Sequence, residues 1–468
     1  MTKFKGIERV AHANEETLAF IEEVCSVEFF HDLDPVVITR APGRLDVMGG
    51  IADYSGSLVL QLPIANATYV ALQKSESLSL RMASEGGRSL EFNLANFDGP
   101  IEYEAARKLV AKPQDHWASY VAGVFLVLMR EKSVSFKQGA SILIRSNVPE
   151  GKGVSSSAAV EVAVMQAVAA AFDIEMDCRE LATLCQKVEN LVAGAPCGIM
   201  DQMTSSCGEE NRLLELLCQP DQLRGTLEIP PELELWGVDS GVRHAISGSD
   251  YTTVRTAAFM GYRIIADVAE LKTRINQGGK LSIDDPRWNG YLANVTPDEF
   301  EETFLRGLPS TIKGEDFLSR YDGITDTVTS VKPGIEYPVR QAATHAIYEN
   351  ARVRSFAATL KDWQGLADAP QLGELMFESH QSYSDCGLGS EATDLIVKLV
   401  RDARADGLYG ARITGGGSGG TVAVLGRSSA RGAIETVVKR FAEQTGYNPL
   451  IFSGSSPGAS TFGHVTVQ

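Results

Sequence analysis

No two cysteines in this chain have the C-x-x-C spacing of a redox or zinc motif. The seven cysteines, at positions 25, 178, 185, 197, 207, 218 and 386, are odd in number and scattered. This pattern is typical of a protein of a reducing compartment, and it contains no zinc-binding motif.

Long apolar runs and an excess of positive charge are also missing. The longest apolar run, residues 162–172, is interrupted by Gln166 and is far shorter than the roughly 20 residues that a membrane helix needs. No apolar region follows Lys3 and Lys5, so we expect no signal peptide. The net charge of −17 argues against binding to nucleic acid or to an anionic membrane surface. We therefore expect a soluble, cytoplasmic protein that engages neither nucleic acid nor a membrane.

The chain alternates strand-like and helix-like segments, which predicts an α+β fold. Its 468 residues suggest about two to four domains. A helix is expected within residues 1–34, with Leu18, Ile21, Val24 and Cys25 on one face. Residues 273–330 are acidic and are interpreted as an insertion without assigned chemistry. We predict strands at 36–39, 58–62, 68–72, 141–144, 233–239 and 450–453, a hairpin over 78–92, and helices over 116–129, 179–192, 336–361, 371–383, 391–405 and 434–444.

The segment Arg40 to Tyr54 combines one proline and three glycines with charged side chains, so we expect an irregular backbone. Arg44, Asp46 and Asp53 supply charges that an ordinary loop does not need. One interpretation is a surface loop with a local Arg–Asp pair, which would contribute little to stability. The apolar strands on either side favour a position against a core.

The segment from residue 147 to 163 is suited to hold a phosphate. Two glycines, Gly151 and Gly153, precede a run of three serines and a helix of small residues, whose N-terminus offers free N–H groups. No lysine stands where a Walker loop requires one. The segment is thus a phosphate cradle of another kind or a glycine-rich turn before a core helix.

Three further features carry polar groups or unusual backbone. Glu189 lies beside the apolar stripe of its predicted helix, where a carboxylate usually has a cation or a metal as partner. Asp201 follows a helix break, and an isolated aspartate there is most often a helix cap. The run Gly415 to Gly420 holds five glycines in six residues, which lets the backbone approach a ligand or another loop closely.

Taken together, Arg40 to Tyr54, Pro149 to Ala159 and Arg412 to Gly420 resemble the three motifs of the GHMP small-molecule kinases. The family is named for galactokinase, homoserine kinase, mevalonate kinase and phosphomevalonate kinase. Residues 196–202 match a segment particular to the galactokinase branch. The resemblance implies a two-lobed fold, with a ribosomal-S5-domain-2-like N-terminal lobe over 1–230 and a ferredoxin-like C-terminal lobe over 231–468.

The resemblance also implies ATP and Mg²⁺ as cofactors and gives roles to individual residues. Asp201 would orient or deprotonate a sugar hydroxyl, and Arg44 would stabilise negative charge beside it. Ser157 and Glu189 would coordinate magnesium. The remaining implied contacts are Gly151, Gly153, Ser155, Ser156 and Ser157 for the triphosphate, Trp117 and Tyr120 near the adenine (or simply in the core), and Arg44, Gly50, Ile51, Asp53, Gly198, Asp201 and Tyr251 for the sugar.

The sugar segment departs from that of galactokinase. Where galactokinase has Gly-Glu-His-Thr-Asp-Tyr, this chain has Gly50 and Ile51 in place of the Glu and the His. In galactokinases the Glu is implicated in holding the exocyclic hydroxymethyl group, and an unpaired buried hydroxyl costs roughly 1–3 kcal/mol. L-Arabinose, which has the ring stereochemistry of D-galactose without that group, is therefore the expected sugar. The segment Arg40 to Gln61 is also similar to the kinase portion of plant L-arabinokinases.

We thus expect a monomeric or homodimeric ATP-dependent kinase that phosphorylates the anomeric hydroxyl of L-arabinose. The alternatives are a galactokinase, a uronic-acid kinase, and a sugar sensor that binds ATP and sugar without catalysis. The uronic-acid kinase would need a cation that neither Gly50 nor Ile51 provides. The sensor is disfavoured because Arg44, Ser157, Glu189 and Asp201 are all present.

Overall fold

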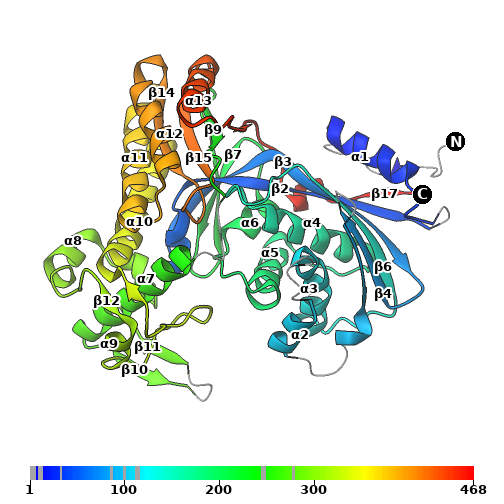
Figure 1. Cartoon of the computed structure of the whole chain (residues 1–468), viewed down its shortest axis with the longest axis horizontal. Coiled ribbons are helices and arrows are strands. Elements are labelled where there is room, and N and C mark those ends of the chain that lie inside the picture. Colours follow the sequence, from blue (N-terminus) through cyan, green and yellow to red (C-terminus); the bar gives the residue numbers. More distant parts are fainter. Residues whose placement is uncertain are drawn as a thin grey trace.

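A computed structural model describes residues 7–8, 14–31, 34–84, 88–97, 102–110, 116–243, 249–276 and 280–468. Two sheets and the helices that cover them organise this part of the chain (Figure 1). The larger sheet has the strand order β1-β17-β2-β3-β6-β4-β5, and β7 and β8 extend from β3. Its strands are β1 (Ile7–Glu8), β2 (Val36–Met48), β3 (Leu58–Ser75), β4 (Ser79–Ser84), β5 (Ser89–Asn93), β6 (Gly139–Ser146), β7 (Arg212–Leu217), β8 (Gln222–Glu228) and β17 (Val465–Val467).

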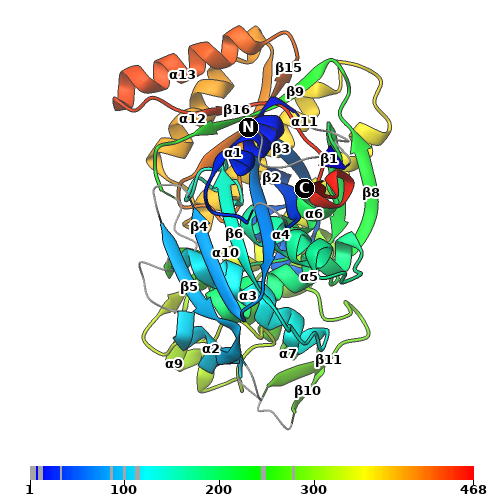
Figure 2. The ribbon, with the colours of Figure 1, turned by 90° about the vertical axis from the view of Figure 1, so that its right-hand side faces the viewer.

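Helices cover both faces of this sheet. On one face, Val70 and Ile142 of the sheet pack with Val124 of α3 and Val164 of α4. Figure 2 shows these helices beside the strands β6, β4 and β5. On the other face α1 buries Phe20, so β2 and β3 are covered from both sides. The helices are α1 (Glu15–Ser26), α2 (Tyr103–Val110), α3 (His116–Glu131), α4 (Ser156–Ala171), α5 (Cys178–Lys187), α6 (Met200–Cys207) and α14 (Ala459–Phe462).

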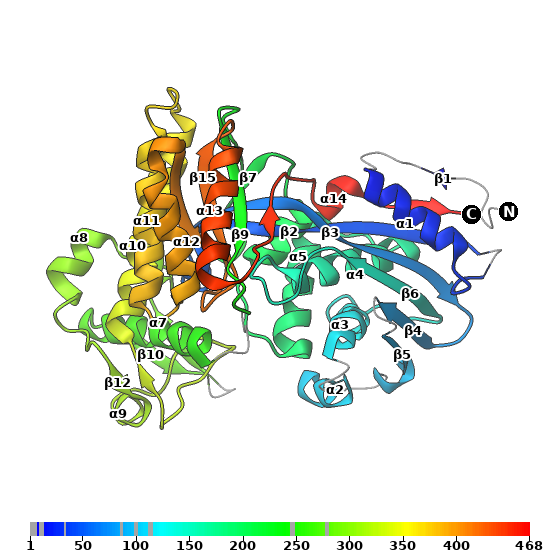
Figure 3. The same cartoon turned by 45° about the horizontal axis from the view of Figure 1, so that its top comes forward.

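The smaller sheet has the order β14-β15-β9-β16 and supports a row of long helices (Figure 3). Trp236 of its strand β9 packs with Phe377, Ile396 and Val437 from three of these helices. The strands are β9 (Leu233–Asp239), β14 (Leu408–Ile413), β15 (Thr421–Arg427) and β16 (Ile451–Phe452), and the helices are α10 (Val339–Lys361), α11 (Ala369–Asp385), α12 (Glu391–Asp402) and α13 (Arg431–Thr445).

The acidic stretch 273–330 forms small elements around an apolar cluster. Trp288, Phe300 and Phe317 are buried against α7 (Ser249–Val268) and α10. This stretch is therefore part of the folded body of the chain. The elements of this stretch are β10 (Lys272–Ile275), β11 (Leu281–Asp284), η6 (Leu292–Asn294), α8 (Pro297–Glu299), η7 (Phe300–Phe304), β12 (Ile312–Lys313), which pairs with β13 (Glu336–Tyr337), and α9 (Gly314–Leu318). Elsewhere in the chain are the 3₁₀ turns η3 (Leu94–Phe97) and η8 (Arg404–Asp406).

Most predicted elements are confirmed, but the prediction for Arg40 to Tyr54 is wrong in part. Residues up to Met48 continue the strand β2, and only the 3₁₀ helix η1 (Gly50–Ser55) is irregular. Register shifts between Pro42 and Arg44 and between Asp46 and Met48 absorb the proline and glycine without ending the strand. Leu18 is also wrong as a core residue, because it is 45% exposed while its helix buries Phe20.

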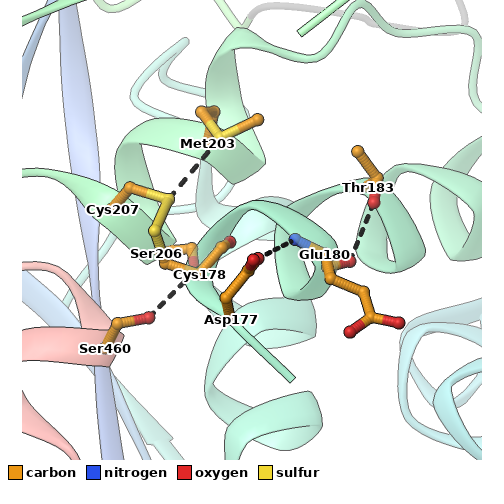
Figure 4. Close-up of a disulfide and its surroundings, with 8 residues drawn as sticks. All are labelled: Asp177, Cys178, Glu180, Thr183, Met203, Ser206, Cys207 and Ser460. Atoms are coloured by element: carbon orange, nitrogen blue, oxygen red, sulfur yellow. Dashed lines mark hydrogen bonds between the residues drawn. A yellow bond between two sulfur atoms is a disulfide. The ribbon is translucent and has the colours of Figure 1, made fainter. Parts of the chain in front are cut away.

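Cysteine pairing also differs from the expectation of a reducing compartment. Cys178 at the start of α5 and Cys207 at the end of α6 form a disulfide, with Cα atoms 5.3 Å apart (Figure 4). The Ser206 hydroxyl donates to the Cys178 carbonyl at 2.8 Å, so the two helix ends are also hydrogen-bonded. A separation of 29 residues gave no sequence signal for this contact, which arises from the packing of α5 on α6.

No helix among the described residues combines the length and the apolar composition needed to cross a membrane.

Candidate active site

The three glycine-rich motifs meet at one cavity. Its walls come from β2 and η1, from the loop before α4, from the segment before α6, from α7 and from the loop between β14 and β15, which contributes Gly416. The predicted residues that line the cavity are Arg44, Ile51, Asp53, Gly151, Gly153, Ser155, Ser156, Glu189, Gly198, Asp201 and Tyr251. Three residues of the segment 196–202, which had no individual role in the prediction, also line it: Pro196, Cys197 and Met200.

Arg44 links two of the motifs. Its guanidinium contacts Asp201 Oδ1 through Nε at 2.9 Å and Nη2 at 2.8 Å, and its Nη1 donates to the Gly153 carbonyl at 2.7 Å. The Arg44 side chain is 3% exposed, so water screens this pair weakly. Asp201 lies inside the first turn of α6, and Ile199 is the N-cap, so the capping interpretation of Asp201 is wrong.

The loop before α4 has the backbone of an anion cradle. Gly151 and Gly153 have φ values of +72° and +70°, which favour glycine, and Ser155 is the N-cap of α4 at φ +60°. The Ser155 hydroxyl is buried and has no hydrogen-bond partner within the described residues. A donor held in a strained conformation at a helix N-terminus suits an anionic ligand.

The third motif packs directly on this loop. A Cβ at Gly153 would lie 3.3 Å from the Thr414 carbonyl oxygen, and Thr421 Oγ1 donates to the Lys152 carbonyl at 2.7 Å. Lys152 itself pairs with Asp239 at 2.8 Å. The buried pair Asp46–Arg412, with Oδ2 and Nη1 2.9 Å apart, joins the first motif to the third.

Glu189 and Ser157, the two predicted magnesium ligands, are in contact with each other. Glu189 is 1% exposed in the π-helical turn η5 (Val188–Ala193), and Ser157 hydrogen-bonds its carboxylate. Burial raises the pKa of Glu189 to about 7, and the Ser157 hydrogen bond opposes that rise. Gln202 Nε2 donates to both Glu189 and the buried Glu161.

The donor set fits Mg²⁺, which commonly uses one or two protein oxygens together with substrate phosphates. Within the described ranges no group of three or more His, Cys, Asp and Glu side chains could hold a metal by itself. Ser157 and Glu189 would thus supply only part of the coordination.

Asp53 is the polar group on the other side of the cavity. Its Oδ1 accepts from Tyr54 N at 2.6 Å, whereas its buried Oδ2 has no hydrogen-bond partner among the residues described. Burial raises the pKa of Asp53 to about 7, with a further contribution from Asp201. A Cβ at Gly198 would lie 1.6 Å from Asp53 Oδ2, so only glycine fits beside this carboxylate.

Arg255 and Asp326 form an ion pair beside the cavity-lining residue Cys197. The sequence analysis assigned neither residue to the site. Arg255 Nε and Nη2 contact Asp326 at 2.8 and 2.9 Å, and Nη1 donates to the Cys197 carbonyl at 3.2 Å. Because Arg255 lies four residues after Tyr251 on α7, helical spacing could have pointed to it. Asp326 belongs to the acidic stretch, which therefore supports the cavity rather than lying apart from it.

The remaining predicted residues lie outside the cavity lining. Trp117 packs against the core beneath α3. Tyr120 interacts electrostatically with Glu189 and has a raised pKa because of burial. Gly50 lies behind Ile51, against Tyr383 and Arg412. Of the predicted polar turn at 241–251, residues 244–248 lie outside the described residues.

This fold and this meeting of three glycine-rich motifs define a small-molecule kinase of the GHMP type, and the chain belongs to the GHMP kinase family. The GHMP kinases N terminal domain matches residues 119–209, the GHMP kinases C terminal domain matches 358–444, and the galactokinase galactose-binding signature matches 27–74.

Among individual relatives, the chain is similar to L-arabinokinase of Arabidopsis thaliana, with 44% identity over 93% of this chain. It spans about half of that protein, 47% of its length. A galactokinase of Chloroflexus aggregans is 31% identical over 89% of this chain and 91% of its own length. The galactokinase of Lactococcus lactis, solved with galactose, has the same fold at a TM-score of 0.72 and 22% identity, covering 94% of this chain and 98% of its own.

Proposed function

We propose that the protein transfers a phosphoryl group from ATP to the anomeric hydroxyl of L-arabinose. The observation that carries this proposal is the aliphatic side of the cavity, where Ile51 lines the wall and Gly50 has no side chain to offer a hydrogen bond. The 44% identity to a plant L-arabinokinase supports it. We also propose that residues 1–230 and 231–468 form the two lobes, with Val465–Val467 returning to the first sheet.

In this proposal the loop before α4 binds the phosphates of ATP. The N–H groups at the start of α4 and the Ser155 hydroxyl, which has no partner among the described residues, would bind the anion. We further propose that Trp117 and Tyr120 contact the adenine. Ser157 and Glu189 would hold Mg²⁺, which when bound would neutralise charge on the phosphates.

Asp201 receives or orients the proton of the anomeric hydroxyl. Arg44 holds the Asp201 carboxylate through two nitrogens, and with its third it fixes the Gly153 carbonyl in the phosphate loop. This arrangement sets the distance between the sugar hydroxyl and the phosphate loop. Such positioning is the main catalytic contribution of a kinase, because phosphoryl transfer needs little covalent chemistry from the protein.

Asp53, Gly198 and Tyr251 form the polar side of the sugar pocket. The free Oδ2 of Asp53 is an acceptor for a sugar hydroxyl. A hexose with an exocyclic hydroxymethyl group would leave that hydroxyl unpaired against Ile51. The cost of roughly 1–3 kcal/mol corresponds to a five- to 150-fold preference for the pentose.

Comparing kcat/KM for L-arabinose and D-galactose with purified protein, ATP and Mg²⁺ tests the proposal. A preference for D-galactose would discard the pentose assignment and favour galactokinase activity, which the similarity to the Chloroflexus enzyme supports as a second candidate. A protein that binds both ligands without releasing ADP would instead be a sensor.

A further inference from the structure

The side chain of Tyr383, from α11, reaches the back of the sugar pocket and is fully buried. Its hydroxyl accepts a hydrogen bond from the Ile51 backbone N–H and donates one to the Gly415 carbonyl, both at 2.8 Å. One hydroxyl thus ties the sugar wall to the third glycine-rich motif, although the three segments are far apart in the sequence.

Tyr383 also decides what can stand at position 50. A Cβ built on Gly50 would lie 1.7 Å from the Tyr383 hydroxyl oxygen and 2.8 Å from its Cζ. Contacts under 3.0 Å essentially never occur for a real Cβ, and the φ of +45° at Gly50 also disfavours a side chain. While Tyr383 keeps its place, no side chain can extend from position 50.

The tyrosine cannot easily move aside. The His345 ring meets it edge-on with centroids 5.0 Å apart, and the Arg412 guanidinium lies 5.1 Å from its ring centroid. Arg412 is itself held by the buried pair with Asp46. Because His345 and Arg412 fix the Tyr383 ring, its hydroxyl holds the Ile51 backbone and fills the space where a side chain at position 50 would lie.

We propose that Tyr383 is a specificity-determining positioning residue, which keeps position 50 free of a side chain and holds Ile51 as the aliphatic wall facing a pentopyranose. This inference rests on the proposed sugar kinase function and adds a residue that does not touch the sugar. Specificity then depends on a contact between α11 and η1 as well as on the residues that line the cavity.

The first test is Tyr383→Phe, which removes both hydrogen bonds and keeps the ring. We expect KM for L-arabinose to rise about tenfold and the preference for L-arabinose over D-galactose to fall at least threefold, with kcat for L-arabinose changed less than KM. The matched control is Tyr337→Phe, another buried tyrosine whose hydroxyl accepts a backbone N–H, that of Lys332 at 2.8 Å. An unchanged sugar preference in Tyr383→Phe, or an equal change in the control, would overturn the inference.

The second test asks whether removing the hydroxyl makes room at position 50. Gly50→Ala in the presence of Tyr383 should lower kcat/KM for L-arabinose at least 100-fold and lower the melting temperature. The double variant, Gly50→Ala with Tyr383→Phe, should have a kcat/KM for L-arabinose at least tenfold higher than that of Gly50→Ala alone. The double variant should also melt at a higher temperature than Gly50→Ala alone. The recovery should be partial, because the ring Cζ and Arg412 Nη2, 2.8 and 2.7 Å from the built Cβ, remain in the double variant.

If Gly50→Ala lowers kcat/KM and the melting temperature equally with and without the Tyr383 hydroxyl, that hydroxyl does not exclude a side chain at position 50 and the inference is refuted. If the wild-type protein phosphorylates neither sugar, the proposed function fails and the melting temperatures alone decide the inference. Rescue of stability in the double variant then supports the contact, and its absence overturns it.

Discussion

Because of Asp53, the free energy of unfolding of the protein should fall as the pH rises, and Asp53→Asn should remove that pH dependence. The carboxyl group is fully buried, and one of its oxygens has no hydrogen-bond partner among the described residues. Burial, followed by the charge of Asp201, raises its pKa from 3.8 to about 7, while Arg255 only partly opposes the rise. The folded protein therefore holds a proton on Asp53 at pH values where the unfolded chain has lost it.

The sign and size of the effect follow from linkage. Between about pH 4 and pH 7 the folded state binds more protons at this group, so the free energy of unfolding falls as pH rises and levels off above pH 7. The difference between the two pKa values corresponds to roughly 4 kcal/mol at pH 8. Asparagine keeps the shape and cannot ionise, so Asp53→Asn should gain most of this stability at pH 8 and little at pH 4.5.

Chemical unfolding of the ligand-free wild-type and Asp53→Asn proteins at pH 4.5, 6, 7 and 8 measures this difference. The same variant should bind the sugar at least tenfold more weakly at pH 8, where the charged acceptor is lost, and the loss of affinity should be smaller at pH 4.5, where Asp53 of the folded protein is protonated. A stability difference that does not grow between pH 4.5 and pH 8 would refute the reasoning.

Glu349 offers a control with the opposite sign. Its burial alone would raise the pKa, but Arg352 and Arg412 outweigh burial and lower it to about 2. The stabilisation is present above the unfolded pKa of 4.5 and is lost only as pH falls toward 2. Glu349→Gln should therefore destabilise the protein by a nearly constant amount between pH 6 and pH 8.

Three further outcomes are expected. Asp201→Asn should lower kcat at least 100-fold while ATP affinity measured by calorimetry stays within threefold, because the proton acceptor is lost and the phosphate loop is kept; retained kcat would exclude a catalytic Asp201. Asp326→Ala should lower the free energy of unfolding by about 3–5 kcal/mol, because Arg255 is left buried without its partner. The variant should also have a higher KM for the sugar, and an unchanged KM would show that the acidic stretch does not support the sugar pocket. Thiol titration of the unreduced, denatured protein should find five free thiols, and Cys178→Ser should lower stability by about 3–4 kcal/mol under oxidising conditions only; seven free thiols would contradict the Cys178–Cys207 bond.

The identity of the site could be predicted from the sequence because its backbone requirements are local. Gly151 and Gly153 adopt the left-handed conformations that glycine permits, and a serine-rich helix start follows them at once. The neighbourhood of Glu189 could be inferred in part, since a carboxylate at the edge of an apolar stripe needs a partner. Arg44 could not be paired with Asp201 by spacing alone, because 157 residues separate them.

Other predictions failed for physical reasons that only the packed structure shows. Arg40 to Met48 remains a strand because its bulges are paired against β3, so composition alone misjudged the backbone. The acidic stretch was given no chemistry from its composition, because its part in the site depends on packing: Trp288 and Phe317 are buried within it, and Asp326 reaches Arg255.

The sequence by itself determined the family, the alternation of elements and the chemistry available in each glycine-rich motif, since these depend on residue type and on contacts within a few residues. Tertiary structure alone decided which groups meet. It set Asp201 against Arg44, joined Cys178 to Cys207, and placed the Tyr383 hydroxyl in the space that a side chain at Gly50 would need. Such contacts link segments tens to hundreds of residues apart, and they form only when the helices and sheets pack together.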